Sequence, residues 1–229
     1  MTDEYEVIIV GAGPVGLSFG NLLGQAGVST LILEANAGLT ADPRAVHYDG
    51  EVMRIFQAMG LSDRVAEISL PVPEMNFTDE HDETLFSVNW GPGRGPQGWT
   101  PANLFHQPDL EGVLREGLQR WPSVTVGFGA TVTAMTQNNG TVEVVAAGET
   151  YRASYLVGCD GAGSFTRKSI GSDWIPLGPA QPWVVADGVL LTDRGVLPQW
   201  PTQHPWPERP HFFMRNVDII AVLFVLVCT

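Results

Sequence analysis

Three glycines near the amino terminus have the spacing of a phosphate-binding turn. Residues 11–16 read Gly-Ala-Gly-Pro-Val-Gly, the pattern GxGxxG, between an apolar run and a segment with helical periodicity. In this context Gly11 permits a tight turn, Gly13 lets the backbone approach a pyrophosphate, and Gly16 lets the helix lie close to the strand. The free N–H groups and partial positive charge of the helix N-terminus then face the phosphates. We therefore predict that this turn, Pro14 included, contacts a pyrophosphate-containing cofactor.

A carboxylate follows at the expected distance. Glu34 ends the next apolar run, eighteen residues beyond Gly16. At this place a carboxylate can bond the hydroxyls of an adenosine ribose, and it would repel a 2′-phosphate. The glycine turn and Glu34 together favour FAD or NAD over NADP as the cofactor. The alternative is a plain glycine turn between packed elements.

These residues need a strand–helix–strand unit to position them. Residues 5–10 and 28–33 are apolar and predict buried parallel strands. The segment 15–25 between them predicts a helix that ends at Gly27. Its expected apolar face consists of Val15, Phe19, Leu22 and Leu23.

Two further helices are expected downstream. Asp49 predicts an N-cap, and the helix after it should end at Gly60. Its expected apolar face consists of Val52, Ile55, Phe56 and Met59. Pro108 opens another helix, whose apolar stripe consists of Leu110, Val113, Leu114 and Leu118.

The period then changes to two, which predicts a β-meander. Its expected strands span 124–128, 131–137, 141–146 and 151–157, with a hairpin turn at Asn139-Gly140. A later strand is expected at 183–191, where Asp187-Gly188 is interpreted as an interruption. The apolar run 219–228 would span only about 15 Å as a helix, too short to cross a membrane, so a buried strand is favoured.

Composition narrows the class of protein. The chain of 229 residues has 44% hydrophobic and 16% charged residues, enough to bury a core. A formal net charge of −13 argues against a nucleic-acid surface, which needs clustered basic residues. Cys159 and Cys228 form no framework of disulfides or metal ligands. The acidic start is not a signal peptide, so a soluble, cytoplasmic protein without a membrane partner is expected.

Three downstream motifs carry a family resemblance. They are Pro43-Arg44-Ala45-Val46-His47, His106-Gln107-Pro108-Asp109-Leu110, and a strand followed by Asp160-Gly161-Ala162-Gly163-Ser164-Phe165-Thr166-Arg167. In this order after GxGxxG, the chain resembles the flavin-dependent hydroxylases of phenols. It is most similar to those acting on hydroxyphenylpropionate and on aromatic polyketides. The resemblance covers residues 5 to about 191.

The resemblance implies roles for these motifs. In the family, the arginine at the position of Arg44 reaches the pyrophosphate or ribityl region of the flavin. The glutamine at the position of Gln107 bonds the ribityl or phosphate groups. The Asp-Gly motif, here Asp160, Gly161 and the associated Arg167, is linked to both FAD and the nicotinamide cofactor.

Each of these residues also has a plainer interpretation. Arg44 can be a surface loop cation, Gln107 a helix cap, and Asp160-Gly161 a simple turn. Asp160 cannot be a direct phosphate ligand, because like charges repel. Its carboxylate more plausibly accepts backbone N–H bonds that fix the loop, or holds Arg167.

Aromatic residues give weaker candidates. His47 and Tyr48 stand beside Arg44 and either face the flavin ring or lie in solvent. Trp90, Trp99 and Phe105 either line an aromatic pocket or, as we favour, pack in the core.

The resemblance implies an α/β fold and an oxidoreductase function. The expected architecture is a Rossmann-like FAD-binding domain (residues 1–70 and 100–172), part of a β-rich substrate domain (71–99 and 173–215) and an atypical apolar tail (216–229). The implied activity is hydroxylation of an aromatic small molecule with FAD, O2 and either NADH or NADPH. No side chain is assigned as a catalytic base, and no metal is expected. The alternatives are a non-catalytic FAD-binding fragment and an NAD-binding oxidoreductase.

The chain also departs from the family pattern. Complete members are longer and carry a Gly-Asp motif whose aspartate bonds the ribityl chain, but the sequence contains no Gly-Asp pair. We therefore expect an incomplete fold, truncated by an early stop or a frameshift near Asn216, and impaired hydroxylase activity.

Overall fold

The computed structural model describes residues 4–39, 44–178, 183–189, 198–206, 210–215 and 220–226. The chain forms two compact units, each assembled from separate segments. The first contains residues 1–44, 56–61 and 107–175, and the second contains 45–55, 62–106 and 176–229. The predicted domain boundaries stay a prediction.

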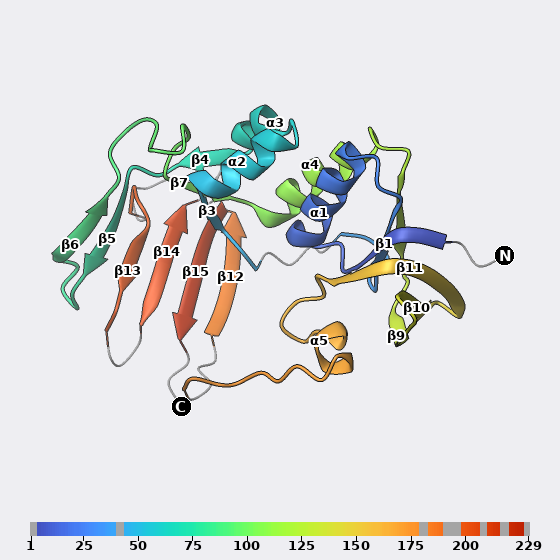
Figure 1. Ribbon diagram of the computed structural model, residues 1–229. Helices are drawn as coiled ribbons and strands as arrows, with labels where there is room; N and C mark the ends of the chain where they lie inside the picture. Colours follow the sequence, from blue (N-terminus) through green and yellow to red (C-terminus); the bar gives the residue numbers. More distant parts are fainter. Residues whose placement is uncertain are drawn as a thin grey trace. The chain divides into compact units, whose positions relative to one another are not determined.

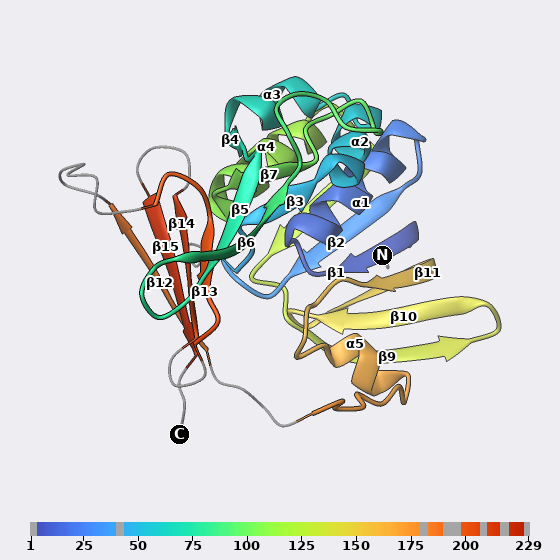
Figure 2. The ribbon, with the colours of Figure 1, turned by 90° about the vertical axis from the view of Figure 1, so that its left-hand side faces the viewer.

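The first unit is built on a six-stranded sheet with the order β8-β2-β1-β11-β10-β9 (Figures 1 and 2). Four strands are parallel neighbours, and β9 and β10 extend the sheet as an antiparallel hairpin beside β11. The strands are β1 (Glu4–Val10), β2 (Thr30–Glu34), β8 (Val124–Phe128), β9 (Val132–Asn138), β10 (Thr141–Ala146) and β11 (Glu149–Gly158).

The parallel strands are buried because both faces of the sheet are covered. Ile8 and Ile9, adjacent in β1, point to opposite faces, and both are fully buried. Helix α1 (Pro14–Gln25) packs against β1, β2 and α4 (Gln107–Leu118). On the other face, Ile8 and Val10 join a core cluster with Val142 and Val144 of β10. The continuous apolar character of 5–10 therefore predicted the right kind of strand.

The predicted packing face of the first helix is wrong. Val15 is 65% exposed and Phe19 41%. The buried positions of α1 are Gly16, Leu17, Gly20, Asn21 and Gly24. Small side chains let the backbone of α1 approach the sheet. The size of the side chains, and not their hydrophobicity, therefore determines which face of α1 is buried.

The helix after Asp49 is confirmed, with a different buried face. The Asp49 carboxylate accepts hydrogen bonds from the backbone N–H groups of Glu51 and Val52, and so caps α2 (Gly50–Ala58). Phe56 is buried as expected, but Ile55 is 44% exposed and Met53 is buried in its place. The stripe of α4 is buried as predicted.

The predicted meander is right for three strands and wrong for one. Asn139 and Gly140 both have positive φ, as a tight hairpin turn requires, and they join β9 to β10. Strand β8, however, pairs in parallel with β2 at the other end of the sheet. Periodicity identifies a strand, but it does not identify its partner.

Among the described residues, the second unit contains two sheets, the first part of α2 and one further short helix. A three-stranded sheet has the order β3-β7-β4, and a six-stranded sheet has the order β12-β15-β14-β13-β5-β6. The strands are β3 (His47–Asp49), β4 (Ser69–Pro71), β5 (Glu74–Thr78), β6 (Thr84–Asn89), β7 (Ala102–Phe105), β12 (Trp183–Val189), β13 (Thr202–His204), β14 (His211–Arg215) and β15 (Ile220–Leu226). Helix α3 (Ser62–Glu67) was not anticipated, nor was α5 (Phe165–Ser169) in the first unit.

The carboxy-terminal strands revise one prediction and confirm another. Asp187-Gly188 does not interrupt its strand, because β12 runs through both residues and pairs them with Val222 and Ala221 of β15. The apolar run after 219 is a strand, as favoured, and it pairs with β12 and β14. Residues 190–191, 219 and 227–228 of these predicted strands lie outside the described residues. In the part of the chain that the structure describes, no helix is long and apolar enough to cross a membrane.

Two glycines in helices give a matched test of this packing. A Cβ built on Gly24 in α1 would lie 2.6 Å from Cγ of Trp121, whereas one on Gly112 in α4 would meet nothing within 4 Å. We expect Gly24→Ala to lower the free energy of unfolding by about 1–3 kcal/mol, through overpacking. Gly112→Ala should raise it by about 0.5–1 kcal/mol, through helix propensity. Urea denaturation of both variants checks this, and a stabilising Gly24→Ala would disprove the close packing.

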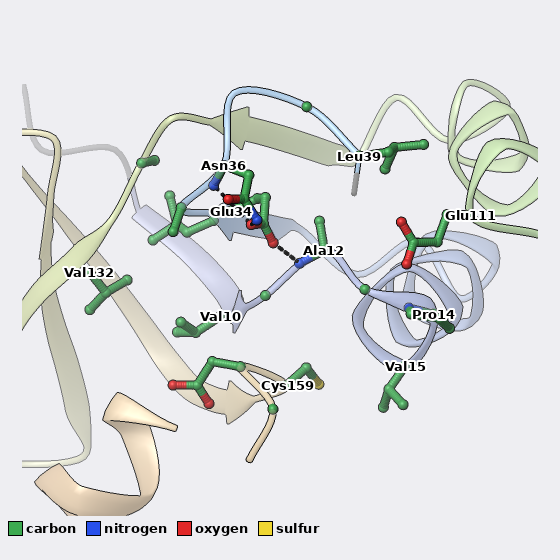
Figure 3. A pocket seen from close by; sticks show the side chains of 18 of the residues that line it. Val10, Ala12, Pro14, Val15, Glu34, Asn36, Leu39, Glu111, Val132 and Cys159 are labelled. Carbon is green, nitrogen blue, oxygen red and sulfur yellow. Dashed lines mark hydrogen bonds between the residues drawn. The ribbon is translucent and has the colours of Figure 1, made fainter. Parts of the chain in front are cut away.

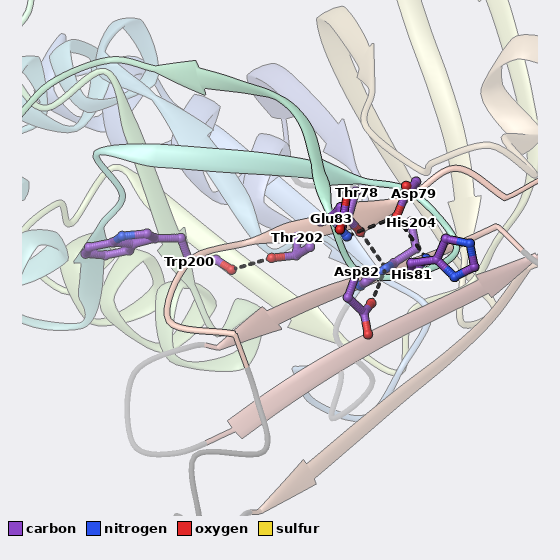
Figure 4. A network of polar contacts seen from close by, with 8 residues as sticks. All are labelled: Thr78, Asp79, His81, Asp82, Glu83, Trp200, Thr202 and His204. Carbon is purple, nitrogen blue, oxygen red and sulfur yellow. Dashed lines mark hydrogen bonds and ion pairs between the residues drawn. The ribbon is translucent and has the colours of Figure 1, made fainter.

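His204 in the second unit lies in a network of polar contacts with Thr78 and Asp82 (Figure 4). His204 is 6% exposed, its Nδ1 lies 2.7 Å from Oγ1 of Thr78 and 3.4 Å from a carboxylate oxygen of Asp82, and its ring stacks on His211. Burial, together with the charge of His211, lowers the pKa of His204, although Asp82 opposes this. His204 therefore binds a proton more readily in the unfolded chain than in the folded chain.

The neutral form of His204 therefore stabilises the fold fully above the unfolded-state pKa of about 6.5. This stabilisation is lost as the pH falls through the lower folded-state pKa. We expect the free energy of unfolding to decrease between pH 7.5 and 5.5. His204→Gln should weaken that decrease, and the exposed His81→Gln should leave it unchanged. Urea denaturation at several pH values measures the slopes, and equal slopes for the parent and His204→Gln would contradict the assignment.

Candidate cofactor site

A cavity of about 420 Å³ lies at the carboxyl ends of three parallel strands in the first unit (Figure 3). Gly11 follows β1, Glu34 ends β2, and Cys159 follows β11. The strand ends are tied together, because Gly11 N–H donates to the carbonyl of Leu33 and Cys159 N–H donates to that of Val10. Open α/β sheets bind ligands at this edge.

The three glycines of the turn differ in the space around them. Gly11 has a φ of +103°, and a Cβ there would overlap the Cys159 carbonyl oxygen. A Cβ on Gly16 would overlap the Gly11 carbonyl oxygen, so this glycine lets α1 begin directly against the turn. Beside Gly13, by contrast, a Cβ would meet nothing within 4 Å. Gly13 thus borders open space, and a side chain there would stand in the cavity.

The start of α1 suits an anion. Its N-cap is Gly13, which provides no side-chain cap, and the first turn contains no acidic residue. The N–H groups at such a terminus have no partner within the helix. Pro14 and Val15, at the start of this helix, line the cavity. A helix end of this kind can bind a phosphate.

Glu34 braces the turn and also lines the cavity. One carboxylate oxygen accepts the N–H of Ala12 at 2.7 Å, and the other accepts the backbone and side-chain N–H groups of Asn36 (Figure 3). A carboxylate has about four acceptor sites, so these three bonds leave room for a ribose hydroxyl. The bond to Ala12 was not anticipated from the sequence.

Arg44 and Gln107 meet in the wall of the cavity, which both line. The backbone N–H of Arg44 donates to Oε1 of Gln107 at 2.8 Å, across 63 residues of sequence. Gln107 is 5% exposed, and its Nε2 donates to Glu111 at 2.7 Å. Gln107 is therefore more than a helix cap, because it fixes the loop that carries Arg44.

Glu111 is a charged site residue that the sequence reasoning missed. Its carboxylate lines the cavity, yet the residue is only 1% exposed. Two signals pointed to it: it stands four residues after Gln107, on the same helix face, and it interrupts the apolar stripe between Leu110 and Leu114. A buried carboxylate is retained where it has hydrogen-bond donors, as it has in Gln107.

Asp160 fixes its own loop, as one interpretation held. Its carboxylate accepts Oγ–H of Ser164 at 2.6 Å and the backbone N–H of Thr166 at 2.9 Å. Burial acts to raise the pKa of Asp160, but these bonds together hold it below its usual value, so the group is ionised at neutral pH. Gly161 also lines the cavity and has a φ of +74°, which favours glycine.

Asp160 does not hold Arg167. The guanidinium of Arg167 donates to the carbonyl of Ala162 at 2.7 Å and lies over the ring of Trp174. Arg167 is not among the described residues that line the cavity, so its role as a cofactor contact stays a prediction. Cys159 does line it, but burial, aided by Asp160, raises the pKa of its thiol and makes it a poor nucleophile.

The aromatic candidates lie in the second unit. Phe105 is buried in the core, as favoured, beside Tyr48, whose hydroxyl donates to Ser69. His47 and Trp90 line a cavity of about 500 Å³, and Trp99 lines a smaller one of about 220 Å³. No group of three or more metal-ligating side chains occurs among the described residues.

Comparison with known proteins assigns the family. A model described as "FAD binding domain" matches residues 4–208, and the chain belongs to this family. A 3-(3-hydroxy-phenyl)propionate/3-hydroxycinnamic acid hydroxylase of Paraburkholderia xenovorans (strain LB400) is 37% identical over 191 residues, which are 81% of this chain and 30% of the relative. The chain thus spans about a third of the length of the curated relatives it matches.

Solved structures share the fold. A p-nitrophenol 4-monooxygenase from Pseudomonas putida DLL-E4 superposes with a TM-score of 0.87 at 22% identity, over 99% of this chain and 58% of that one. A flavin-dependent monooxygenase solved with FAD and substrate gives 0.83 at 22% identity, over 100% and 44%. The predicted fold class and family resemblance are confirmed.

The brace between Gln107, Arg44 and Glu111 can be tested without a ligand. Gln107→Met keeps the length of the side chain but removes the acceptor of the Arg44 N–H and the Nε2 donor to Glu111. We expect the free energy of unfolding to fall by about 1–3 kcal/mol, the range for the loss of these hydrogen bonds, one of which is to a carboxylate. The exposed Gln119→Met should change it by less than about 0.5 kcal/mol. Equal values for the two variants in urea denaturation would disprove the brace.

Proposed function

We propose that the chain binds FAD in the cavity of the first unit and serves the NAD(P)H- and O2-dependent hydroxylation of a phenolic ring. The observation that carries the proposal is the meeting of the glycine turn, the uncapped start of α1 and Glu34 at one edge of the parallel sheet. Membership in the FAD-binding family and the hydroxylase names of the relatives support it. Bound FAD would supply the transfer of electrons from NAD(P)H and the activation of O2.

The cavity residues would divide the work of holding FAD. Gly11, Gly13, Pro14 and Gly16 would seat the pyrophosphate against the start of α1. Glu34 would accept a ribose hydroxyl with its remaining acceptor site.

Arg44 and Asp160 would have roles different from those of the glycine turn and Glu34. Arg44 would place a positive charge near the phosphates, on a loop held by Gln107. Asp160 is acceptor-only and ionised, so it would shape the loop that carries Gly161 and would not meet a phosphate. Arg167 would contact the cofactor from outside the cavity wall that the described residues form.

Two other functions compete with hydroxylation: a non-catalytic FAD-binding role and NAD-dependent oxidoreduction. A visible spectrum of the purified chain separates them, because bound flavin absorbs near 450 nm and NAD does not. Oxidation of NADH or NADPH coupled to a hydroxylated phenol then distinguishes an enzyme from a binding protein. Flavin with phenol-dependent product formation supports the proposal; NAD binding without flavin overturns it.

Gly13→Val tests the seat of the pyrophosphate. The Cβ of the valine would lie in open space, with nothing within 4 Å, so the fold should persist while flavin content drops at least about tenfold. Gly178→Val is the matched control, since a Cβ there also meets nothing within 4 Å and the residue lies outside the cavity. Flavin per chain, measured by absorbance, should fall only in Gly13→Val. Retention of the parental flavin content would refute the phosphate seat.

A further inference from the structure

We propose that the apolar cavity of the second unit binds the aromatic substrate and selects neutral phenols of two or more rings over ring carboxylates. This proposal rests on the proposed function. The cavity has a volume of about 500 Å³ and lies between the three-stranded and the six-stranded sheet of this unit.

The wall of the cavity has the chemistry of an aromatic-ring site. Trp90 and Phe212 contribute aromatic rings, and Met75 and Met214 contribute thioethers, which make favourable contacts with aromatic edges. Leu104 of β7 belongs to the wall and to the same buried cluster as Met214. Such a surface binds a flat apolar ring better than a flexible polar chain.

Strand register places the polar groups of the larger sheet on the other face. Phe212 and Met214 alternate along β14 with His211 and Phe213. The latter two contact His204, which joins the polar network with Thr78 and Asp82 (Figure 4). On the cavity side, Gln203 of β13 is paired with Phe212. Its amide can donate to and accept from a phenol hydroxyl.

The described residues of the cavity wall provide no positive charge for an anionic ring. Neither Lys nor Arg lines this cavity among the described residues. His47 is the titratable group in the wall, and burial lowers its pKa more than neighbouring Asp49 raises it, so it is neutral at pH 7.5. An ionised carboxylate would lose water here without gaining a cation, whereas a neutral phenol needs one hydrogen-bonding partner.

The volume of the cavity favours a substrate with more than one ring. An engineered protein cavity of about 150 Å³ holds a single benzene. The cavity here has roughly three times that space. A single phenol would leave much of the apolar wall unfilled, and each unfilled contact lowers affinity.

A matched pair of ligands tests the selection on the full chain. We would measure the binding of 2-naphthol and of 6-hydroxy-2-naphthoate by calorimetry at pH 7.5. These ligands share the ring system and the hydroxyl and differ only in the carboxylate. We expect 2-naphthol to bind at least about tenfold more tightly, since about 1.4 kcal/mol of uncompensated desolvation already gives that ratio. Equal or tighter binding of the naphthoate would overturn the inference.

Two variants at one position locate the effect. Gln203→Arg adds a cation to the cavity wall, so it should raise affinity for the naphthoate and narrow or reverse the ratio. Gln203→Met has a similar length without charge and should keep the parental preference. An unchanged ratio in Gln203→Arg would mean that the ligands bind elsewhere, which also overturns the inference.

Flavin content, measured on the same samples, separates the two proposals. If flavin is bound and neither naphthalene binds, the substrate cavity is wrong and the cofactor proposal stands. If 2-naphthol binds with the expected preference and no flavin is present, the proposed function fails while the ligand selectivity of the cavity stands.

Discussion

The close approach of three backbone segments at Gly11, Gly16 and Cys159 is the constraint on which the first unit depends. A single Cβ at Gly11 or Gly16 would overlap a carbonyl oxygen, so the end of β1, the start of α1 and the end of β11 meet this closely only because these two positions are glycine. That contact brings the free N–H groups of α1 to the carboxyl edge of the sheet, where Glu34 and Asp160 also lie. The same small-residue principle continues along α1 to Gly20 and Gly24.

Polar side chains around the cavity serve first as braces. Glu34 holds Ala12, Gln107 holds the backbone of Arg44, and Asp160 holds the start of α5 through Thr166. Each bond joins a loop to a regular element, and this limits the motion of the cavity wall before any ligand arrives. A preformed wall loses less conformational entropy on binding, which favours affinity for a large cofactor.

The second unit separates two environments across one sheet. Alternation along β13 and β14 places His204, His211 and Phe213 on one face and Gln203, Phe212 and Met214 on the other. The first face forms a polar and aromatic network with Thr78 and Asp82, and the second forms an apolar wall. A ligand in that wall therefore meets rings and thioethers, while the ionisable groups stay with the network.

Local chemistry in the sequence determined the glycine turn, Glu34, the Asn139-Gly140 hairpin and the stripe of α4, because each depends on residues close together in the chain. Tertiary structure decided the rest. The packing face of α1 follows from the space beside β2 and Trp121, and the place of β8 follows from pairing across the sheet. Asp187-Gly188 stays in a strand because β15 pairs with it, and Glu111 enters the cavity wall because Gln107 turns toward Arg44. Hydrogen bonds and contacts between distant segments override local propensity in these places, and a single sequence does not display them.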